Sequence, residues 1–350
     1  MSADLLSGNA GPTPDEERRR TGAVLLGIAK VALAALIIVI LLRRGEIQPG
    51  QLKAALTSHP LLFLLVAAMM TLSYMGQGYR WTVVLRDRAI PAPYWQALRY
   101  LMIGKFFNLA VPGYFSEDIV RGLYLVRNNA ASRSKVFMSL IVDRFVGIVS
   151  LFIVCSGGLG VGYVFGRPGE AHDDLRLAAL RTLVVLITVA CIAAVLLLRL
   201  VPRPPQFLRS LAARLRLLHA LDSSHSELHY YCCTGKLQAK MLGISLVNHS
   251  LVVLSFLVLG GALGVSSVRL ADYCVFVPLG LLVTMVPIAP VGLGVGHLAF
   301  LSLFRIAGSP EGANLFSLFT AVCILLNLSG GLFYLGLGKP IGKPTELRAS

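Results

Sequence analysis

The feature that most constrains this chain is a cluster of prolines and glycines inside an apolar segment near its C-terminus. Residues 286–297 read VPIAPVGLGVGH, in which Pro287, Pro290, Gly292 and Gly294 interrupt any regular helix. Proline removes a backbone donor and glycine weakens a helical turn, so this stretch cannot cross a bilayer as an ordinary helix. In hydrocarbon, the freed backbone groups must be buried in protein or line a polar cavity. We therefore expect a re-entrant segment beside such a cavity.

A second interrupted stretch lies in the first half of the chain. Residues 104–113 read GKFFNLAVPG, where Pro112 and Gly113 break the helix and Lys105 and Asn108 are polar. Paired broken segments in two halves of a membrane protein are typical of transporters, whose central site lies between them. The sequence therefore predicts a protein that handles lipids or solutes within a membrane.

Composition places most of the chain in a bilayer. Hydrophobic residues make up 56%, charged residues 14%, and the mean hydropathy is +0.74, whereas a soluble domain carries about 25% charged residues. Apolar stretches that could span the membrane are Val24–Leu42, Leu61–Tyr74, Val136–Phe165, Ala178–Leu198, Leu242–Leu263 and Leu315–Leu337. The predicted fold is an all-α polytopic membrane protein with about six full transmembrane helices and two re-entrant segments. The comparable spacing of Gly104–Pro112 and Gly280–Pro287 adds the hypothesis of an inverted pseudo-repeat.

The polar regions define the expected domain organisation. Residues 1–22 are predicted to be a disordered cytoplasmic leader, and residues 23–338 the transmembrane domain. Within that domain, residues 199–240 are predicted to form a basic, amphipathic helical loop in the cytoplasm. Residues 339–350 form a cytoplasmic tail.

The net charge of +15 concentrates in the leader and in residues 80–99, 121–135, 199–240 and 339–348. The positive-inside rule then places the chain in a cell membrane with both termini on the cytoplasmic side. The first re-entrant segment would enter from the cytoplasm and the second from outside. Three basic residues on the resulting outer loop run against this topology: Arg43, Arg44 and Lys53. The positive charge would also attract anionic lipid, but the topology alone is enough to explain it. No motif indicates binding to nucleic acid.

Ionisable residues at membrane depth are unfavourable and are therefore candidates for a functional site. Glu117 and Asp118 follow the first break, at a predicted helix N-terminus where the helix dipole favours acids. Arg121 lies four residues after Glu117 and three after Asp118, so it shares a helix face with both. The other candidates for substrate binding or translocation are Lys105, Asn108, Asp143, Arg144 and His297.

Structural interpretations of several polar residues remain open. Lys105 could snorkel to the interface, and Asp143 with Arg144 could lock two helices together. Asn248 and His249 are typical of interhelical hydrogen bonds.

Several motifs occur in the same order in a known family. They are Arg80–Trp81, GKFFN at 104–108, Pro112–Gly113, Asp118 with Arg121, VDR at 142–144 with Gly147, and Pro287 with GLG at 292–294. Over about residues 61–337 the chain resembles the transmembrane, flippase-like region of lysylphosphatidylglycerol synthases. The resemblance implies a membrane region that moves an aminoacylated phospholipid between leaflets, while a separate cytosolic domain performs aminoacyl transfer. Archaeal relatives carry glycosyltransferase domains that act on lipid-linked sugars.

The chain departs from that family pattern at two places. Tyr114, Phe115 and Ser116 stand where the family usually has small residues between Pro-Gly and the acid. His297 stands where the second motif usually ends in glutamate, and it replaces a fixed negative charge with a group that titrates near neutral pH. Both departures suggest a head group different from that of better-known members.

The leading interpretation is a lipid translocase that moves an anionic, aminoacylated or glycosylated lipid between leaflets. One alternative is an enzyme, or a membrane subunit, of lipid-linked glycosyl or aminoacyl transfer, and another is a scaffold for a partner synthase. No catalytic residues can be assigned, and the six cysteines show no metal-binding spacing, so neither a metal nor a cofactor is expected. No ATP-binding loop is present. The expected partners are membrane lipids, with a separate synthase or transferase and a homo-oligomer as further possibilities.

Overall fold

The computed structural model describes residues 57, 60–109, 115–128, 133–165, 175–214, 218–285 and 294–336. In these ranges the regular elements are all helices, which confirms the predicted fold class. They are α3 (Pro60–Asp87), α4 (Tyr94–Asn108), α5 (Phe115–Asn128), α6 (Arg133–Phe165), α7 (Leu175–Leu200), α8 (Gln206–Arg214), α9 (Leu218–Cys233), α10 (Gly235–Ala262), α11 (Leu270–Thr284), α12 (Val295–Ile306) and α13 (Gly312–Leu335).

Five of these helices, α3, α6, α7, α10 and α13, are long and apolar enough to cross a membrane. They coincide with five of the six predicted crossings, and the remaining one, Val24–Leu42, lies outside the described residues. In α7 only 6% of the most apolar window is buried inside the bundle. Nearly the whole circumference of α7 is therefore available to lipid.

The extent of α3 corrects one expectation. The sequence placed Arg80 in a basic cytoplasmic cluster beyond a span that ended at Tyr74, but α3 continues to Asp87 and Arg80 lies inside it. Arg80 is only 7% exposed. It can be buried in a membrane helix because Asp143 on α6 neutralises it.

Short helices flank both interrupted stretches. Helix α4 packs against α5, and α11 packs against α12, which is the arrangement that two re-entrant hairpins require. The GKFFN motif, expected to belong to the first break, is instead the regular end of α4. The predicted helix breaks Pro112, Gly113, Pro287, Pro290 and Gly292 lie outside the described residues. Gly294 is described: it precedes α12 with φ of +79°, a conformation that favours glycine.

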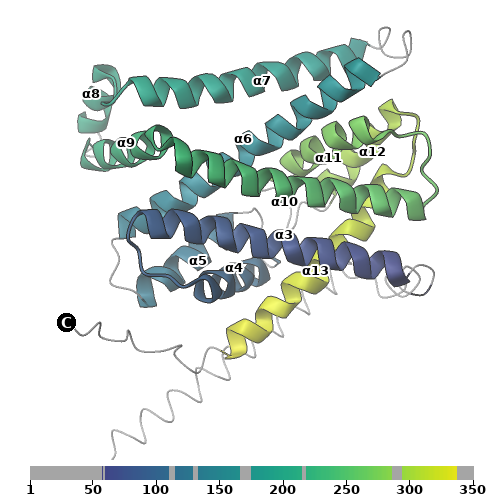
Figure 1. Ribbon diagram of the computed structural model, residues 1–350, viewed down its shortest axis with the longest axis horizontal. Helices are drawn as coiled ribbons and strands as arrows, with labels where there is room; N and C mark the ends of the chain where they lie inside the picture. Colours follow the sequence, from purple (N-terminus) through teal and green to yellow (C-terminus); the bar gives the residue numbers. More distant parts are fainter. Residues whose placement is uncertain are drawn as a thin grey trace, which may run out of the picture.

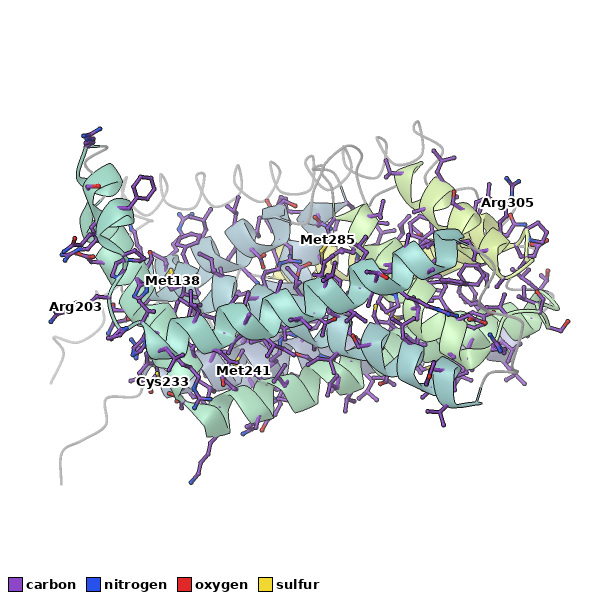
Figure 2. The ribbon with its side chains drawn as sticks, turned by 90° about the horizontal axis from the view of Figure 1, so that it is seen from above. Met138, Arg203, Cys233, Met241, Met285 and Arg305 are labelled. Atoms are coloured by element: carbon purple, nitrogen blue, oxygen red, sulfur yellow. The ribbon has the colours of Figure 1, made fainter. Side chains whose placement is uncertain are left out.

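The two short pairs lie toward opposite ends of the long helices. Helices α4 and α5 are near the end that also carries α8 and α9, and α11 and α12 are near the other end (Figure 1). Arg203 and Cys233 mark the first end and Arg305 the second (Figure 2). This placement agrees with re-entrant segments that enter from opposite sides, the first from the side of the basic loop.

The two halves of the bundle pack reciprocally. Each half runs as a long helix, two short helices and a long helix: α3 to α6, and α10 to α13. Helix α4 of the first half packs on α13 of the second, while α11 of the second packs on α6 of the first, and α3 packs along α10. This exchange is the packing that an inverted pseudo-repeat predicts.

Glycines permit the close approaches at these contacts. A Cβ atom at Gly158 on α6 would lie 2.6 Å from Cβ of Cys274 on α11, and one at Gly330 on α13 would collide with the carbonyl of Met102 on α4. Aromatic rings fill the second half, where Phe256 and Phe300 stack with centroids 4.9 Å apart. These contacts fix the long helices around a central space.

A charged cavity between the two halves

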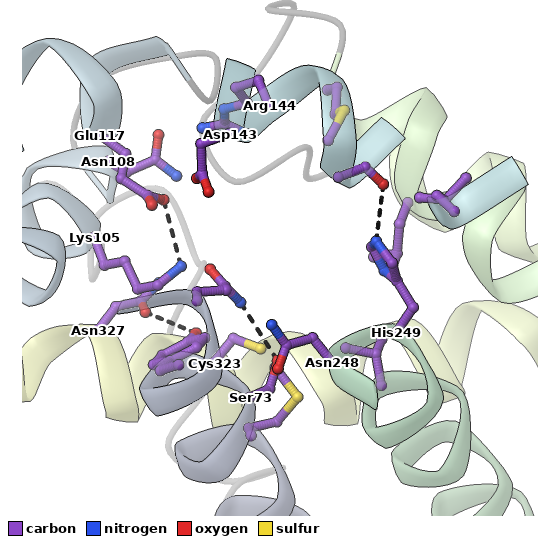
Figure 3. Close-up of a pocket in the computed structure, with 18 of the residues that line it drawn as sticks. Ser73, Lys105, Asn108, Glu117, Asp143, Arg144, Asn248, His249, Cys323 and Asn327 are labelled. Carbon is purple, nitrogen blue, oxygen red and sulfur yellow. Dashed lines mark hydrogen bonds and ion pairs between the residues drawn. The ribbon is translucent and has the colours of Figure 1, made fainter. Parts of the chain in front are cut away.

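A cavity of about 200 Å³ lies between the long helices, and both halves of the chain contribute to its walls. Figure 3 shows Glu117, Asp143 and Arg144 on one side, with Ser73, Asn248 and Asn327 on the other. The polar lining residues are Ser73, Tyr74, Gln77, Arg80, Lys105, Asn108, Glu117, Arg121, Asp143, Arg144, Asn248, His249, Thr320 and Asn327. Apolar residues, among them Leu151, Val252 and Phe319, complete the wall.

The charged side is an alternating chain of three arginines and two aspartates. Arg80 Nε lies 2.7 Å from Asp143 Oδ1, and Arg121 Nη2 lies 3.1 Å from Asp143 Oδ2. The same Arg121 nitrogen is 2.6 Å from Asp118 Oδ1, an ion pair without hydrogen-bond alignment. Arg144 Nε is 2.5 Å from Asp118 Oδ2. Each aspartate is therefore held between two guanidinium groups.

Burial makes these pairs obligatory. Arg121 and Asp143 are each only 2% exposed. An isolated charge at such a position would carry a desolvation penalty of several kcal/mol. Bracketing by two arginines places a cation on each side of these aspartates and links α3, α5 and α6.

A separate ion pair in the cavity wall joins α4 to α5. Lys105 Nζ on α4 lies 3.4 Å from Glu117 Oε2 on α5 and 4.2 Å from the centre of the Tyr74 ring. Gly104 allows this contact, because a Cβ atom there would lie 2.7 Å from the carbonyl oxygen of Glu117. Asn108 is also tied to α5, since its Oδ1 accepts a hydrogen bond of 2.9 Å from Ser116.

The opposite wall is neutral and hydrogen-bonded. The Tyr74 hydroxyl donates to Asn327 Oδ1 at 2.9 Å, and Gln77 Nε2 donates to Ser73 Oγ at 3.4 Å. His249 Nε2 lies 3.0 Å from the carbonyl oxygen of Gly147, so that nitrogen carries the proton. This wall draws on α3, α10 and α13.

The structure brings together most of the predicted site. Lys105, Asn108, Glu117, Arg121, Asp143 and Arg144 all line the cavity, and Asp118 supports it through Arg121 and Arg144. Glu117 and Arg121 both face the cavity from α5, as expected, and the ion pair of Glu117 is with Lys105 on α4. Asp143 and Arg144 do link helices, and each does so through its own partner: Asp143 pairs with Arg80 on α3, and Arg144 pairs with Asp118 on α5.

His297 lies apart from this group. It does not line the cavity; its Nδ1 accepts from the backbone nitrogen of Gly294 at 3.3 Å and its Nε2 lies 2.9 Å from Ser317 Oγ. Its ring does contact Phe316, a cavity residue, with centroids 5.0 Å apart. A role for His297 in the site remains a prediction.

Sequence reasoning missed the polar face of α3. Ser73, Gln77 and Arg80 follow one another at spacings of four and three residues, which places them on one side of a helix. That periodicity within an apolar segment was the available signal. Asn248 and His249, which the sequence favoured as interhelical contacts, also line the cavity.

The helical fold and the buried charged cavity define a polytopic membrane protein with a polar site between two packed halves. The model of the lysylphosphatidylglycerol synthase transmembrane-region family matches residues 27–329. The chain therefore belongs to this family. No curated protein and no solved structure matches the chain.

Proposed function

We propose that the chain is a lipid translocase whose cavity carries the polar head group of a membrane lipid between leaflets. The observation that carries this proposal is the charged cavity itself: ionisable side chains gather between helices that are long enough to cross a bilayer. Such residues are unfavourable in a membrane and mark substrate pathways.

The size of the cavity suits a head group rather than a whole lipid. Its volume of about 200 Å³ is that of six or seven water molecules at about 30 Å³ each. The acyl chains would remain in the bilayer while the head group crosses. Three arginines on one wall supply the planar donors that recognise phosphate.

The arrangement of the broken hairpins supports movement between leaflets. They lie toward opposite ends of the bundle, with the cavity between the halves that carry them (Figure 1). Reciprocal packing of α4 on α13 and of α11 on α6 provides two equivalent surfaces along which the halves can rock. Alternating access in transporters with inverted repeats uses such motions.

A leaflet-reporter assay tests the proposal. The purified chain is reconstituted in liposomes with fluorescent anionic, aminoacylated or glycosylated lipids, and a membrane-impermeant quencher reports the outer leaflet. We expect the wild type to accelerate the exchange of at least one lipid over protein-free liposomes, and Arg121→Ala to abolish the gain. Each aspartate that Arg121 contacts keeps a second arginine, so this variant should still fold.

Arg127→Ala is the matched control. Arg127 lies on the same helix, α5, and is exposed, so its loss should leave exchange unchanged. Exchange by Arg121→Ala at the wild-type rate would refute the assignment of the cavity. No acceleration of any lipid by the wild type would refute the translocase itself.

A further inference from the structure

The charges around the cavity do not cancel. Among the described residues that line or support it, the cations are Arg80, Lys105, Arg121 and Arg144, and the anions are Glu117, Asp118 and Asp143. With His249 neutral, one positive charge remains. In a site of low dielectric this excess favours a ligand with one negative charge and disfavours a cation.

Each carboxylate of the cavity is already paired with a cation of the protein. Glu117 is held by Lys105, and Asp118 and Asp143 are each held by two arginines. An ammonium group that enters the cavity would have to displace one of these cations. Within the described residues, every carboxylate of the cavity therefore already has a cation beside it, and even Asp118 Oδ1, which has no aligned hydrogen bond, lies 2.6 Å from Arg121 Nη2.

The donors, in contrast, are not all used. Arg121 Nε and Asn248 Nδ2 are buried nitrogens that have no hydrogen-bond partner within the described part of the chain. Both residues line the cavity and are at least nine-tenths buried, with exposures of 2% and 5%. An unpaired buried donor is unfavourable, and a ligand oxygen that accepts from it would remove this penalty.

The two unpaired donors belong to the two different walls. Arg121 is part of the guanidinium chain, and Asn248 lies with Ser73 and Asn327 on the neutral side (Figure 3). A ligand that satisfies both needs an anionic oxygen at one end and neutral oxygens at the other.

Building on the proposed translocase function, we infer that the cavity selects a lipid head group with a single phosphodiester charge and free hydroxyls, and that it rejects aminoacylated head groups. Phosphatidylglycerol and phosphatidylinositol have this chemistry. Lysylphosphatidylglycerol does not, because its added lysine makes the head group a net cation. The phosphate would meet the arginines, and the glycerol or sugar hydroxyls would meet the amide and hydroxyl wall.

Competition binding tests this inference without transport. Radiolabelled short-chain phosphatidylglycerol is bound to the purified full chain in an uncharged detergent, and Arg121→Ala defines the non-specific background. Unlabelled phosphatidylglycerol and phosphatidylinositol should displace the label at concentrations at least about 10-fold lower than lysylphosphatidylglycerol, a gap of about 1.4 kcal/mol. Whichever of the two displaces the label at the lower concentration identifies a glycerol or an inositol head group.

A negative charge placed in the cavity should weaken or reverse the preference for phosphatidylglycerol over lysylphosphatidylglycerol. Asn248→Asp keeps the size of the side chain and supplies a new carboxylate, so it should narrow or reverse the gap. Asn314→Asp adds the same charge at an exposed position of α13 and should leave the gap unchanged.

Two outcomes would overturn the inference: lysylphosphatidylglycerol that competes equally or better, or no displaceable binding of phosphatidylglycerol. Its failure is distinct from failure of the translocase. If no lipid moves in liposomes while the binding preference is observed, the head-group inference stands and the translocase proposal is refuted. If lipids move and lysylphosphatidylglycerol binds best, the translocase proposal stands and the head-group inference is refuted.

Discussion

Arg80 on α3 and Asp143 on α6 form a buried ion pair of 2.7 Å, and the Arg80 guanidinium also donates to Ser245 on α10 at 2.6 Å. One side chain thus joins three long helices around the cavity. Asp143 has Arg121 as a second partner, so the two members of the pair are not equally replaceable.

The first prediction uses this asymmetry. Asp143→Leu leaves Arg80 without its anion and should destabilise the chain by about 3–5 kcal/mol, the usual penalty for breaking a buried pair. Arg80→Leu should destabilise less, because Asp143 keeps Arg121. Thermal unfolding in detergent measures both. The double variant should be more stable than the sum of the two single effects predicts, and strict additivity would contradict the pairing.

The second prediction concerns Lys105 and Glu117. Lys105→Met leaves an uncompensated buried carboxylate and should lower folded yield and lipid exchange together. Lys105→Met with Glu117→Gln removes the pair but keeps the net charge of the cavity, so it should recover yield and keep the preference for anionic lipids. Size-exclusion chromatography and the competition assay measure these two properties. A double variant that loses the preference would show that Lys105 itself contacts the lipid.

The third prediction compares two neighbouring glycines on α6. A Cβ atom at Gly158 would lie 2.6 Å from Cβ of Cys274 and 3.0 Å from the carbonyl oxygen of Ala271, whereas one at Gly157 meets nothing within 4 Å. Gly158→Ala should therefore destabilise the chain by about 1–3 kcal/mol through overpacking. Gly157→Ala should be neutral or stabilise it by up to about 1 kcal/mol, since alanine favours a helix. Equal melting temperatures would argue against the α6–α11 contact.

The fourth prediction tests topology. Cys233 is exposed and Cys232 is buried, and Cys233 lies at the opposite end of the bundle from Arg305 (Figure 2). An impermeant maleimide should label Cys233 only from the cytoplasmic side, in inside-out vesicles. Arg305→Cys in a Cys233→Ser background should react only in right-side-out vesicles. Labelling of both positions from one side would invalidate the predicted orientation.

The fifth prediction concerns His297. Its Nδ1 caps the backbone nitrogen of Gly294 at the start of α12, which glutamate three residues into a helix can also do. His297→Glu should therefore keep wild-type stability, while His297→Leu should lose about 1 kcal/mol. The sequence further predicts that His297→Glu changes head-group preference or its pH dependence. Unchanged selectivity from about pH 5 to 8, across the usual histidine pKa, would leave His297 with a structural role only.

Much of the fold could be read from the sequence because hydropathy and helix breakers are local signals. The predicted span Leu242–Leu263 ends one residue from the end of α10 at Ala262, and the helix N-terminus predicted just before Glu117 is the start of α5 at Phe115. The pair of Asp118 and Arg121 was predictable because it lies within one helix turn. Hydropathy also separated the long helices from the loops, apart from the C-terminal part of α3 and the first residues of α10.

The rest depended on tertiary packing. Arg80 looked like a loop residue because its counter-ion, Asp143, is 63 positions away in the chain. Glu117 lay within reach of two cations, and only the packing of α4 on α5 decided in favour of Lys105. The neutral wall could not be assembled from the sequence for a similar reason: polar residues of three separate helices converge only after folding.

The reciprocal packing of the two halves gives the chain an approximate twofold arrangement. Contacts of α4 with α13 and of α6 with α11 are those that two identical subunits exchange across a twofold axis, so the chain has the form of a fused antiparallel dimer. The charged groups of the cavity, from Arg80 to Arg144, all belong to the first half, and the second half supplies neutral groups such as Asn248 and Asn327. The two halves therefore share a packing arrangement and differ in chemistry: the first holds the charged groups, and the second adds neutral groups around the ligand that those charges would bind.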